Sequence, residues 1–391
     1  MKSNTLSRAG LNGENGTARN VHYGDILIKF GDCLDGERSD LPFITDDTVL
    51  PKFAGSILRE GDVIFADTAE DEAAGKCVEL RKLPKEPTIS GLHTIPARPR
   101  FFFGTGYLGH YLNSDAYHRQ LLPLMQGIKV ISVSKAALQD TQVRFPGLSE
   151  QAAIGAALSE IDNLITLHQR KYDKLVIFKK SMLEKMFPKD GESVPEIRFA
   201  GFTDPWEQRQ LGELVTTTIG GGTPSTSNPA YWDGEIPWIQ SSNVLEDTLF
   251  DVDIPKAITQ KGLEESAAQI VPENSIAVVT HVGVGKLIYL PFQYSTSQDF
   301  ISLCGLKGDA RYTCYALWKR LQEDLHIVQG SAIKGITKED LLEKNLPMPS
   351  VEEQAQIGVL FSQLDNLITL HQRKLELLQN IKKSLLDKMF V

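Results

Sequence analysis

The sequence predicts an α+β protein in which two α/β globular domains are separated by two long helices. We expect the helices to pair antiparallel as a coiled coil, with the two halves of the chain related by a pseudo-two-fold internal repeat. The domain boundaries are placed at 1–145 and 191–347 for the globular domains, and at 146–190 and 348–391 for the helices. This prediction depends on an internal repeat, a heptad seam and a set of strand-like runs.

The chain contains a long internal sequence repeat. Residues 148–187 and 351–390 align without gaps, with 24 of 40 positions identical, including the block DNLITLHQRK, at an offset of 203 residues. The stretches that precede the two copies have diverged. A nearly identical segment behind two different globular parts suggests one scaffold that presents two different surfaces. Gene duplication without a division of function is the alternative.

Each copy carries apolar residues at alternating spacings of four and three, which is the heptad seam of a coiled coil. About 40 helical residues span about 60 Å and cannot bury such a seam alone, so the other copy is the expected partner. The central histidines would then meet, and we interpret them as polar residues that fix the register. The seam positions are Ile154, Leu158, Ile161, Ile165, His168, Tyr172 and Leu175 in the first copy, and Ile357, Phe361, Leu364, Ile368, His371, Leu375 and Leu378 in the second.

The globular parts alternate short apolar runs with glycine and proline. This pattern predicts strands at DILIKF (25–30), GDVIFAD (61–67), KCVELRKL (76–83), ENSIAVVTHV (273–282) and KLIYL (286–290). Helices are expected near 103–123 and 310–326. A mixed or antiparallel sheet in each part follows from these runs.

The composition excludes several classes of protein. With 41 Lys and Arg against 50 Asp and Glu, the net charge is −9, which argues against a broad basic surface that holds nucleic acid unaided. No stretch approaches the roughly 18 apolar residues of a membrane span, and no secretory signal is visible. The four cysteines are scattered, as is typical of reduced thiols in a cytoplasmic protein without a metal site.

Partial motifs suggest catalytic or nucleotide sites only weakly. Gly104, Gly106 and Gly109 form G-x-G-x-x-G, but aligning TGYLGHYLNS with TCYALWKRLQ (313–322) removes the glycines in the second half. HVGVGKL (281–287) is better explained as a glycine turn between strands. NPAYW (228–232) is similar to the N-P-P-Y motif of adenine methyltransferases, but Ala230 interrupts it and no S-adenosylmethionine loop accompanies it. We expect no catalytic residues and no metal ligands.

The chain resembles the specificity subunits of type I restriction-modification enzymes. WEQRQLGEL (206–214), GGTPSTSNPAYWDGEIPW (221–238) and PSVEEQAQIG (349–358) are similar to the second half of that family, and TLSRAGLNGENG (5–16), NVHYGDILIKF (20–30) and SGLHTIPARP (90–99) to one of its recognition-domain types. The resemblance implies two target-recognition domains that each read half of a split double-stranded DNA target. It also implies two modification (methyltransferase) subunits on the helices, restriction subunits, and S-adenosylmethionine, ATP and Mg bound by those partners rather than by this chain.

One segment departs from the repeat. The second half opens with FAGFTDPWEQRQLGEL (199–214), and the first half has no recognisable copy of it before SRAGL (7–11). The opening strand that this segment supplies to the second domain therefore has no visible counterpart in the first domain.

Base readout favours Arg or Lys for guanine, Asn or Gln for adenine, and adaptable hydroxyls. Polar, glycine-flanked loops supply such residues, although each could be an ordinary solvated side chain. The candidates are Arg8, Lys29, Lys76, Arg98 and Arg100 in the first domain, and Thr223, Ser225, Gln240, Ser241, Ser242, Asn243 and Lys286 in the second. A catalytic adenine-N6 methyltransferase and a coiled-coil scaffold without a DNA role remain the alternative functions.

Overall fold

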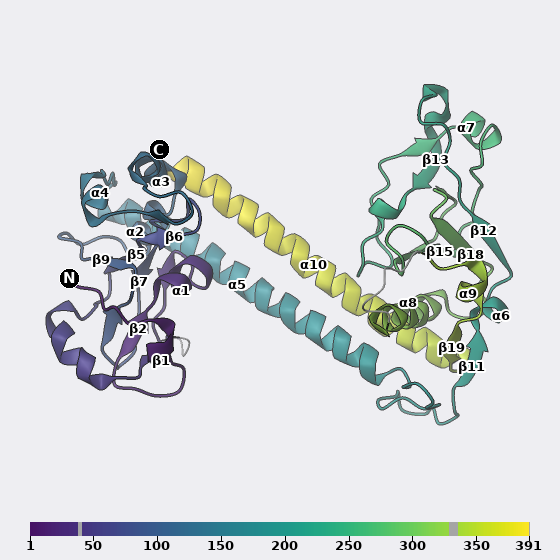
Figure 1. Ribbon diagram of the computed structural model, residues 1–391, viewed down its shortest axis with the longest axis horizontal. Helices are drawn as coiled ribbons and strands as arrows, with labels where there is room; N and C mark the ends of the chain where they lie inside the picture. The colour runs from purple at the N-terminus through teal and green to yellow at the C-terminus, as the bar shows by residue number, and fades with distance from the viewer. Residues whose placement is uncertain (38–40, 328–334, 391) are drawn as a thin grey trace. The chain divides into compact units, whose positions relative to one another are not determined.

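The computed structural model describes residues 1–37, 41–327 and 335–390 (Figure 1). The chain forms two compact units, one made of Met1–Arg170 with Gln372–Val391 and the other of Lys171–His371. Each unit therefore combines one globular part with the beginning of the long helix that follows it and the end of the other long helix. None of the described helices is both long and apolar enough to cross a membrane.

The two repeated segments are the long helices α5 (Leu148–Lys185) and α10 (Val351–Met389). In the first unit, Leu385 near the end of α10 packs in one core with Ile154 near the start of α5. In the second unit, Leu175 towards the end of α5 packs in one core with Ile357 near the start of α10. The start of one helix thus meets the end of the other in both units, which confirms the antiparallel pairing. His168 belongs to the first unit and His371 to the second, and their proximity stays a prediction.

Two partly buried ion pairs repeat the symmetry of the sequence. Lys382 Nζ lies 2.6 Å from Asp162 Oδ1 in the first unit, and Lys179 Nζ lies 2.5 Å from Asp365 Oδ1 in the second. Both lysines and both aspartates are related by the offset of 203 residues. A polar pair inside an apolar seam is satisfied in one register only, so these pairs fix the pairing of the helices.

The first unit is built on short strands. Its sheets have the orders β3-β7-β5-β9, β1-β4-β2-β8 and β10-β6, and β5 and β7 are buried along their whole length. The strands are β1 (Leu11–Asn12), β2 (Arg19–Val21), β3 (Cys33–Leu34), β4 (Phe43–Ile44), β5 (Val63–Ala66), β6 (Thr68–Ala69), β7 (Cys77–Leu80), β8 (Thr88–Ser90), β9 (Thr94–Ala97) and β10 (Ile131–Ser132). The short helices are α1 (Tyr23–Ile28), α2 (Tyr107–Leu112), α3 (Asp115–Leu121) and α4 (Lys135–Asp140).

The strand predicted at 25–30 is wrong, because this run forms helix α1. The Nδ1 atom of His22 accepts a hydrogen bond from the Gly24 N–H and caps the helix, and Asp25 in its first turn is buried against Arg8. Six residues carry too little periodicity to distinguish a helix from a strand, so these contacts decide.

The helix predicted over 103–123 is interrupted between α2 and α3. The side chain of Asn113 donates to the carbonyl of Gly109 and exchanges two hydrogen bonds with the backbone of Cys77. Side-chain bonds of this kind compete with the helical backbone ladder.

The second unit has a buried central sheet of order β12-β18-β15-β16, a smaller sheet β14-β13-β17 and the pair β11-β19. The strands are β11 (Glu207–Gln210), β12 (Thr217–Gly220), β13 (Trp232–Ile239), β14 (Ala257–Ile258), β15 (Ser275–Val279), β16 (Leu287–Leu290), β17 (Ser295–Thr296), β18 (Phe300–Cys304) and β19 (Asn345–Met348). The helices besides the long ones are α6 (Leu211–Leu214), α7 (Gln260–Glu264), α8 (Ala310–Ile327) and α9 (Lys338–Leu342). The strands predicted at 61–67, 76–83, 273–282 and 286–290 and the helix near 310–326 are confirmed.

Aromatic contacts show which residues of the two units correspond. Tyr107 packs edge-on against Phe390 at 5.6 Å, and Tyr312 stacks on Phe187 at 5.5 Å, where the two phenylalanines are equivalent in the repeat. Tyr107 therefore corresponds to Tyr312. The sequence alignment that placed Tyr107 opposite Tyr315 is wrong by three residues, because it matched letters in a diverged stretch.

Candidate nucleic-acid interface

Three predicted segments of the second unit meet at one loop, residues 295–299. The segment after β12 joins it through Gly222 N–H to Thr296 O at 2.8 Å, and the end of β13 through Ser297 N–H to Ile239 O at 2.8 Å. The β15–β16 hairpin joins it through Thr280 N–H to Asp299 O at 2.8 Å. Residues that lie far apart in the sequence are thus gathered at one end of the sheets, beyond β15 and β13.

The side chains at this loop are mostly polar: Ser295, Thr296 and Ser297 are buried, whereas Gln298 is exposed and Asp299 is partly exposed. Thr223 Oγ1 donates to Gln298 Oε1 at 2.5 Å, and Ser225 is exposed one turn further along. Gln240, Ser241, Ser242 and Asn243 form a 3-10 turn directly after β13; the Asn243 side chain accepts from the Gln240 N–H at 3.0 Å.

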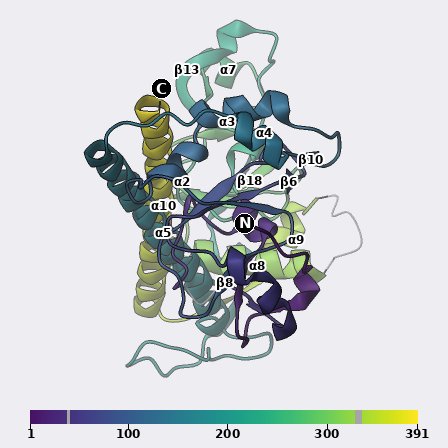
Figure 2. The same cartoon turned by 90° about the vertical axis from the view of Figure 1, so that its left-hand side faces the viewer.

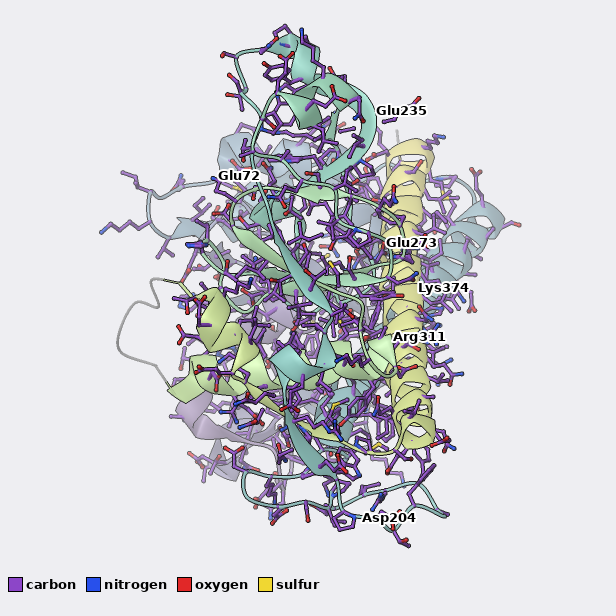
Figure 3. All side chains as sticks on the ribbon, turned by 90° about the vertical axis from the view of Figure 1, so that its right-hand side faces the viewer. Glu72, Asp204, Glu235, Glu273, Arg311 and Lys374 are labelled. Atoms are coloured by element: carbon purple, nitrogen blue, oxygen red, sulfur yellow. The ribbon has the colours of Figure 1, made fainter. Side chains whose placement is uncertain are left out.

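A buried tryptophan holds these segments in place. Trp238 Nε1 donates to the carbonyl of Gly222 at 3.1 Å and so ties the loop before Thr223 to the strand before Gln240. The indole is 3% exposed and packs against Trp232 at 5.1 Å. Figure 3 shows the β13 region that carries Glu235 on one side of the second unit, away from Arg311, which begins α8 beside α10.

Lys286 lies at the base of the hairpin turn between β15 and β16. Gly283 and Gly285 have φ of +86° and +91°, which glycine adopts without strain. This confirms the glycine turn predicted for HVGVGKL. Within the described residues, the Lys286 ammonium has no hydrogen-bond or ion-pair partner, so the charge remains available.

Sequence reasoning missed Gln298 and Asp299. They belong to a polar run, STSQD, between two buried strands, and the run itself was the only signal. The run joins the candidate interface through hydrogen bonds with segments distant in the sequence, such as the bond that Thr223, 75 residues away, donates to Gln298.

The first unit has the same arrangement around residues 90–93. Strand β2 pairs parallel with β8, as β13 does with β17. The backbone hydrogen bonds that correspond to those of the second unit are Asn4 N–H to Ser90 O, Gly91 N–H to Val21 O and Asp67 N–H to His93 O. The counterpart of the Gln240–Asn243 turn is then the start of α1, at 22–25.

The surface chemistry at this place differs between the units. In the first unit, the rings of His22, Tyr23 and His93 form a chain with centroid separations of 4.7 and 5.3 Å. His93 Nδ1 lies 3.3 Å from Asp67 Oδ1. The sequence analysis did not predict these aromatic residues as part of the site. It assigned 25–30 to a strand, so the turn at 22–25 that begins α1 was not recognised.

Of the residues predicted in the first unit, Arg8 and Lys29 come together. They line a hollow of about 380 Å³, with Asp25 between them. Arg8 makes a bidentate pair with Asp25 at 2.6 and 2.9 Å but keeps 62% of its side chain exposed. The guanidinium is therefore oriented by the protein and still reachable.

The remaining three lie elsewhere. Lys76 Nζ donates to the carbonyls of Leu27 and Phe30 at 3.0 and 3.4 Å, which closes the end of α1. Arg98 is held by Asp62 at 2.7 and 2.8 Å. Arg100 is exposed in the loop after β9. The structure does not gather these residues with Arg8, and their DNA contacts remain predictions.

A buried charge network in the first unit has the spacing of a metal site. Ligand atoms of Asp32, His110 and Asp162 lie within 4.8 Å of one another. However, the Lys382 ammonium lies 2.6 Å from a carboxylate oxygen of each aspartate and supplies the positive charge there. Burial alone would raise the pKa of Asp32, but its hydrogen bond with His110 and the charge of Lys382 outweigh burial and lower the pKa to about 2. We assign the cluster to helix docking.

The G-x-G-x-x-G segment is also occupied by the protein itself. Glu79, which is buried, accepts the Gly106 and Gly109 N–H groups at 2.6 and 2.9 Å. A carboxylate thus lies where a nucleotide phosphate would bind. In NPAYW, Asn228 Oδ1 accepts from the Ala230 N–H at 3.1 Å and caps its own turn.

Residues 203–380 match the family of the type I restriction modification DNA specificity domain. The match lies in the second half of the chain. The specificity domain so defined includes the 221–243 segments, the 295–299 loop and most of α10.

Similar proteins extend the likeness over the first half. A Methanocaldococcus jannaschii protein, provisionally named the type I restriction enzyme MjaX specificity subunit, is 24% identical over 339 residues, covering 84% of this chain and 77% of its own. The crystal structure of a type I restriction-modification S subunit from M. genitalium aligns with a TM-score of 0.57 at 14% identity, over 100% of this chain and 93% of the other. A structure described for complex assembly of the type I R-M system aligns with a TM-score of 0.50 at 19% identity, over 95% and 90%. The fold is therefore that of the specificity subunits.

Proposed function

We propose that this chain is the DNA sequence-recognition subunit of a type I restriction-modification complex, and that it is itself non-catalytic. The observation that carries the proposal is the loop arrangement repeated in both units, at 295–299 and at 90–93, with different side chains on each. One scaffold with two surfaces suits a split target whose halves differ in sequence.

Partner subunits supply the chemistry in this proposal. Two modification subunits bind the helical region, restriction subunits join them, and S-adenosylmethionine, ATP and Mg are bound by those partners in the cytoplasm. The acidity of the chain supports this division, because a net charge of −9 gives little attraction for phosphates and leaves much of the backbone grip to the partners.

The test is methylome sequencing of cells that express the chain with its modification subunits. Gln298→Ala and Thr223→Ala should relax one half of the methylated motif and leave the other half unchanged. Gln363→Ala, at an exposed position on α10, is the matched control and should leave the motif intact. Changes in both halves, or in neither, would contradict independent reading by the two units.

A further inference from the structure

In the second unit, residues 198–214 cover the start of α10 and the neighbouring sheet edge; we call them the opening segment. Trp206 is 3% exposed and packs edge-on against Phe187 and Tyr312 at 6.1 and 6.0 Å. Strand β11 follows it and pairs antiparallel with β19 from Glu207 to Gln210. The opening segment thus supplies one buried aromatic side chain, Trp206, and one strand, β11.

The opening segment also neutralises a buried carboxylate. Arg198 makes a bidentate pair with Glu353 at 2.7 and 2.8 Å, and Glu353 is completely buried. A bidentate arginine–carboxylate pair is specific as well as strong. The opening segment therefore contacts α10 through Arg198, and Trp206, eight positions later, packs on Phe187 and Tyr312.

In the first unit, no described residue covers the counterpart of this surface in this way. Val143 and Phe145, which correspond to Leu346 and Met348 through the repeat, are 38% and 51% exposed, whereas Leu346 and Met348 are 0% and 7% exposed. Residues 142–145 lie outside any strand, and among the described residues none pairs with them as β11 pairs with β19.

The carboxylate at the start of α5 in the first unit is exposed as well. Glu150 corresponds to Glu353 through the same offset but is exposed, and it has no ion-pair partner among the described residues. Leu148 beside it is 50% exposed. An acidic group beside apolar side chains is complementary to the arginine and the strand of the opening segment.

Two further aromatic residues extend the surface. Phe101 and Phe102 are 73% and 80% exposed in the loop after the edge strand β9. The corresponding loop of the second unit is covered, because Lys307 N–H donates to Leu214 O of the opening segment. Phe103 contacts Phe145 at 4.9 Å and joins the two parts. The uncovered Phe145 face is made of Phe101, Phe102, Val143, Phe145, Leu148 and Glu150.

We propose that the Phe145 face is a docking site for a strand-forming segment of a partner protein that carries an arginine for Glu150. The second unit shows the chemistry that fits, because its Arg198 pairs with Glu353 and its strand β11 pairs with β19, at the residues equivalent to Glu150 and to 142–145. The proposal concerns the first unit alone and does not depend on DNA recognition.

The probe is a fluorescent peptide of residues 198–214 added to the full chain, with binding followed by anisotropy. We expect saturable binding at one peptide per chain. Glu150→Arg should weaken it at least tenfold, and a peptide with Arg198→Glu should restore most of the affinity for that variant. Glu160→Arg, exposed on the same helix, is the matched control and should bind the original peptide normally. Both variants should keep the parent melting temperature.

Three results would overturn the proposal. Absence of saturable binding would show that the face does not accept this chemistry. Binding that Glu150→Arg leaves unchanged would mean that the peptide displaces the chain's own opening segment in the second unit. Self-association of the chain that the peptide dissolves would assign the face to a second copy instead of a partner protein.

Discussion

The ammonium of Lys382 lies between the carboxylates of Asp32 and Asp162, and the buried ring of His110 is hydrogen-bonded with Asp32 at 2.9 Å. Burial lowers the pKa of Lys382, but the two carboxylates outweigh burial and raise it above the usual 10.5. The charge of Lys382 is therefore kept at every pH at which the chain works. Its equivalent, Lys179, is paired with Asp365 alone.

Replacing the two lysines should have unequal effects. Lys382→Met leaves the buried carboxylate of Asp32 and the partly buried carboxylate of Asp162 without this cation and should cost about 3–5 kcal/mol of unfolding free energy. Lys179→Met should cost less, because the Tyr315 hydroxyl still donates to Asp365 at 2.6 Å. Urea denaturation of both variants measures the difference, and equal losses would contradict this account.

Acid should destabilise the first unit through Asp32. Its pKa is lowered from 3.8 to about 2, so its contribution is complete above pH 3.8 and is lost as the pH falls through about 2. A shift of this size corresponds to about 2 kcal/mol. Urea unfolding between about pH 2 and pH 5 should show a shallower slope for Asp32→Asn than for the parent; identical slopes would refute the assignment.

At the scale of elements, one glycine decides how closely α5 can approach the loop before α2. A Cβ on Gly155 would lie 2.3 Å from the carbonyl oxygen of Thr105, and its equivalent Gly358 would meet Asp309 at 2.6 Å. The helices dock on their own globular parts at these points.

Gly155→Ala should therefore destabilise by about 1–3 kcal/mol, although alanine is intrinsically the better helix former. Gly147→Ala, at the N-cap of α5 with no atom near the new methyl group, should lose only the modest N-cap preference for glycine and cost less than Gly155→Ala. Thermal melting of the two variants tests this, and a Gly155→Ala variant as stable as the parent would contradict the close approach.

The long helices were predictable because seven seam positions in each copy indicate one period, whereas six residues at 25–30 were too few to indicate any. Hydrogen bonds from side chains, such as those of Asn113, divided the helix expected over 103–123. The sequence showed which loops of the candidate interface are polar. It did not show that these loops lie together at 295–299, because that depends on tertiary hydrogen bonds. Nothing in composition distinguishes Lys76, which closes a helix, from Lys286, which does not.

At the scale of the whole molecule, we expect helix length to set the distance between the two half-sites. One heptad inserted at matching places in both helices keeps the seam in register and adds about 10 Å. That corresponds to at most about three base pairs of extra spacer in the methylated motif, read genome-wide. A functional variant with the original spacer would refute the expectation.

Phe390 packs on Tyr107 and Tyr111 in the core of the first unit. Figure 2 marks this end of α10 with the letter C. These residues follow the whole of the second unit in the sequence, so the globular part of the first unit is made long before the helix end that packs on it. The second unit ends at His371. The first unit can therefore be completed only after every residue of the second unit has been made. Pulse proteolysis of stalled nascent chains should find the second unit protected before the first.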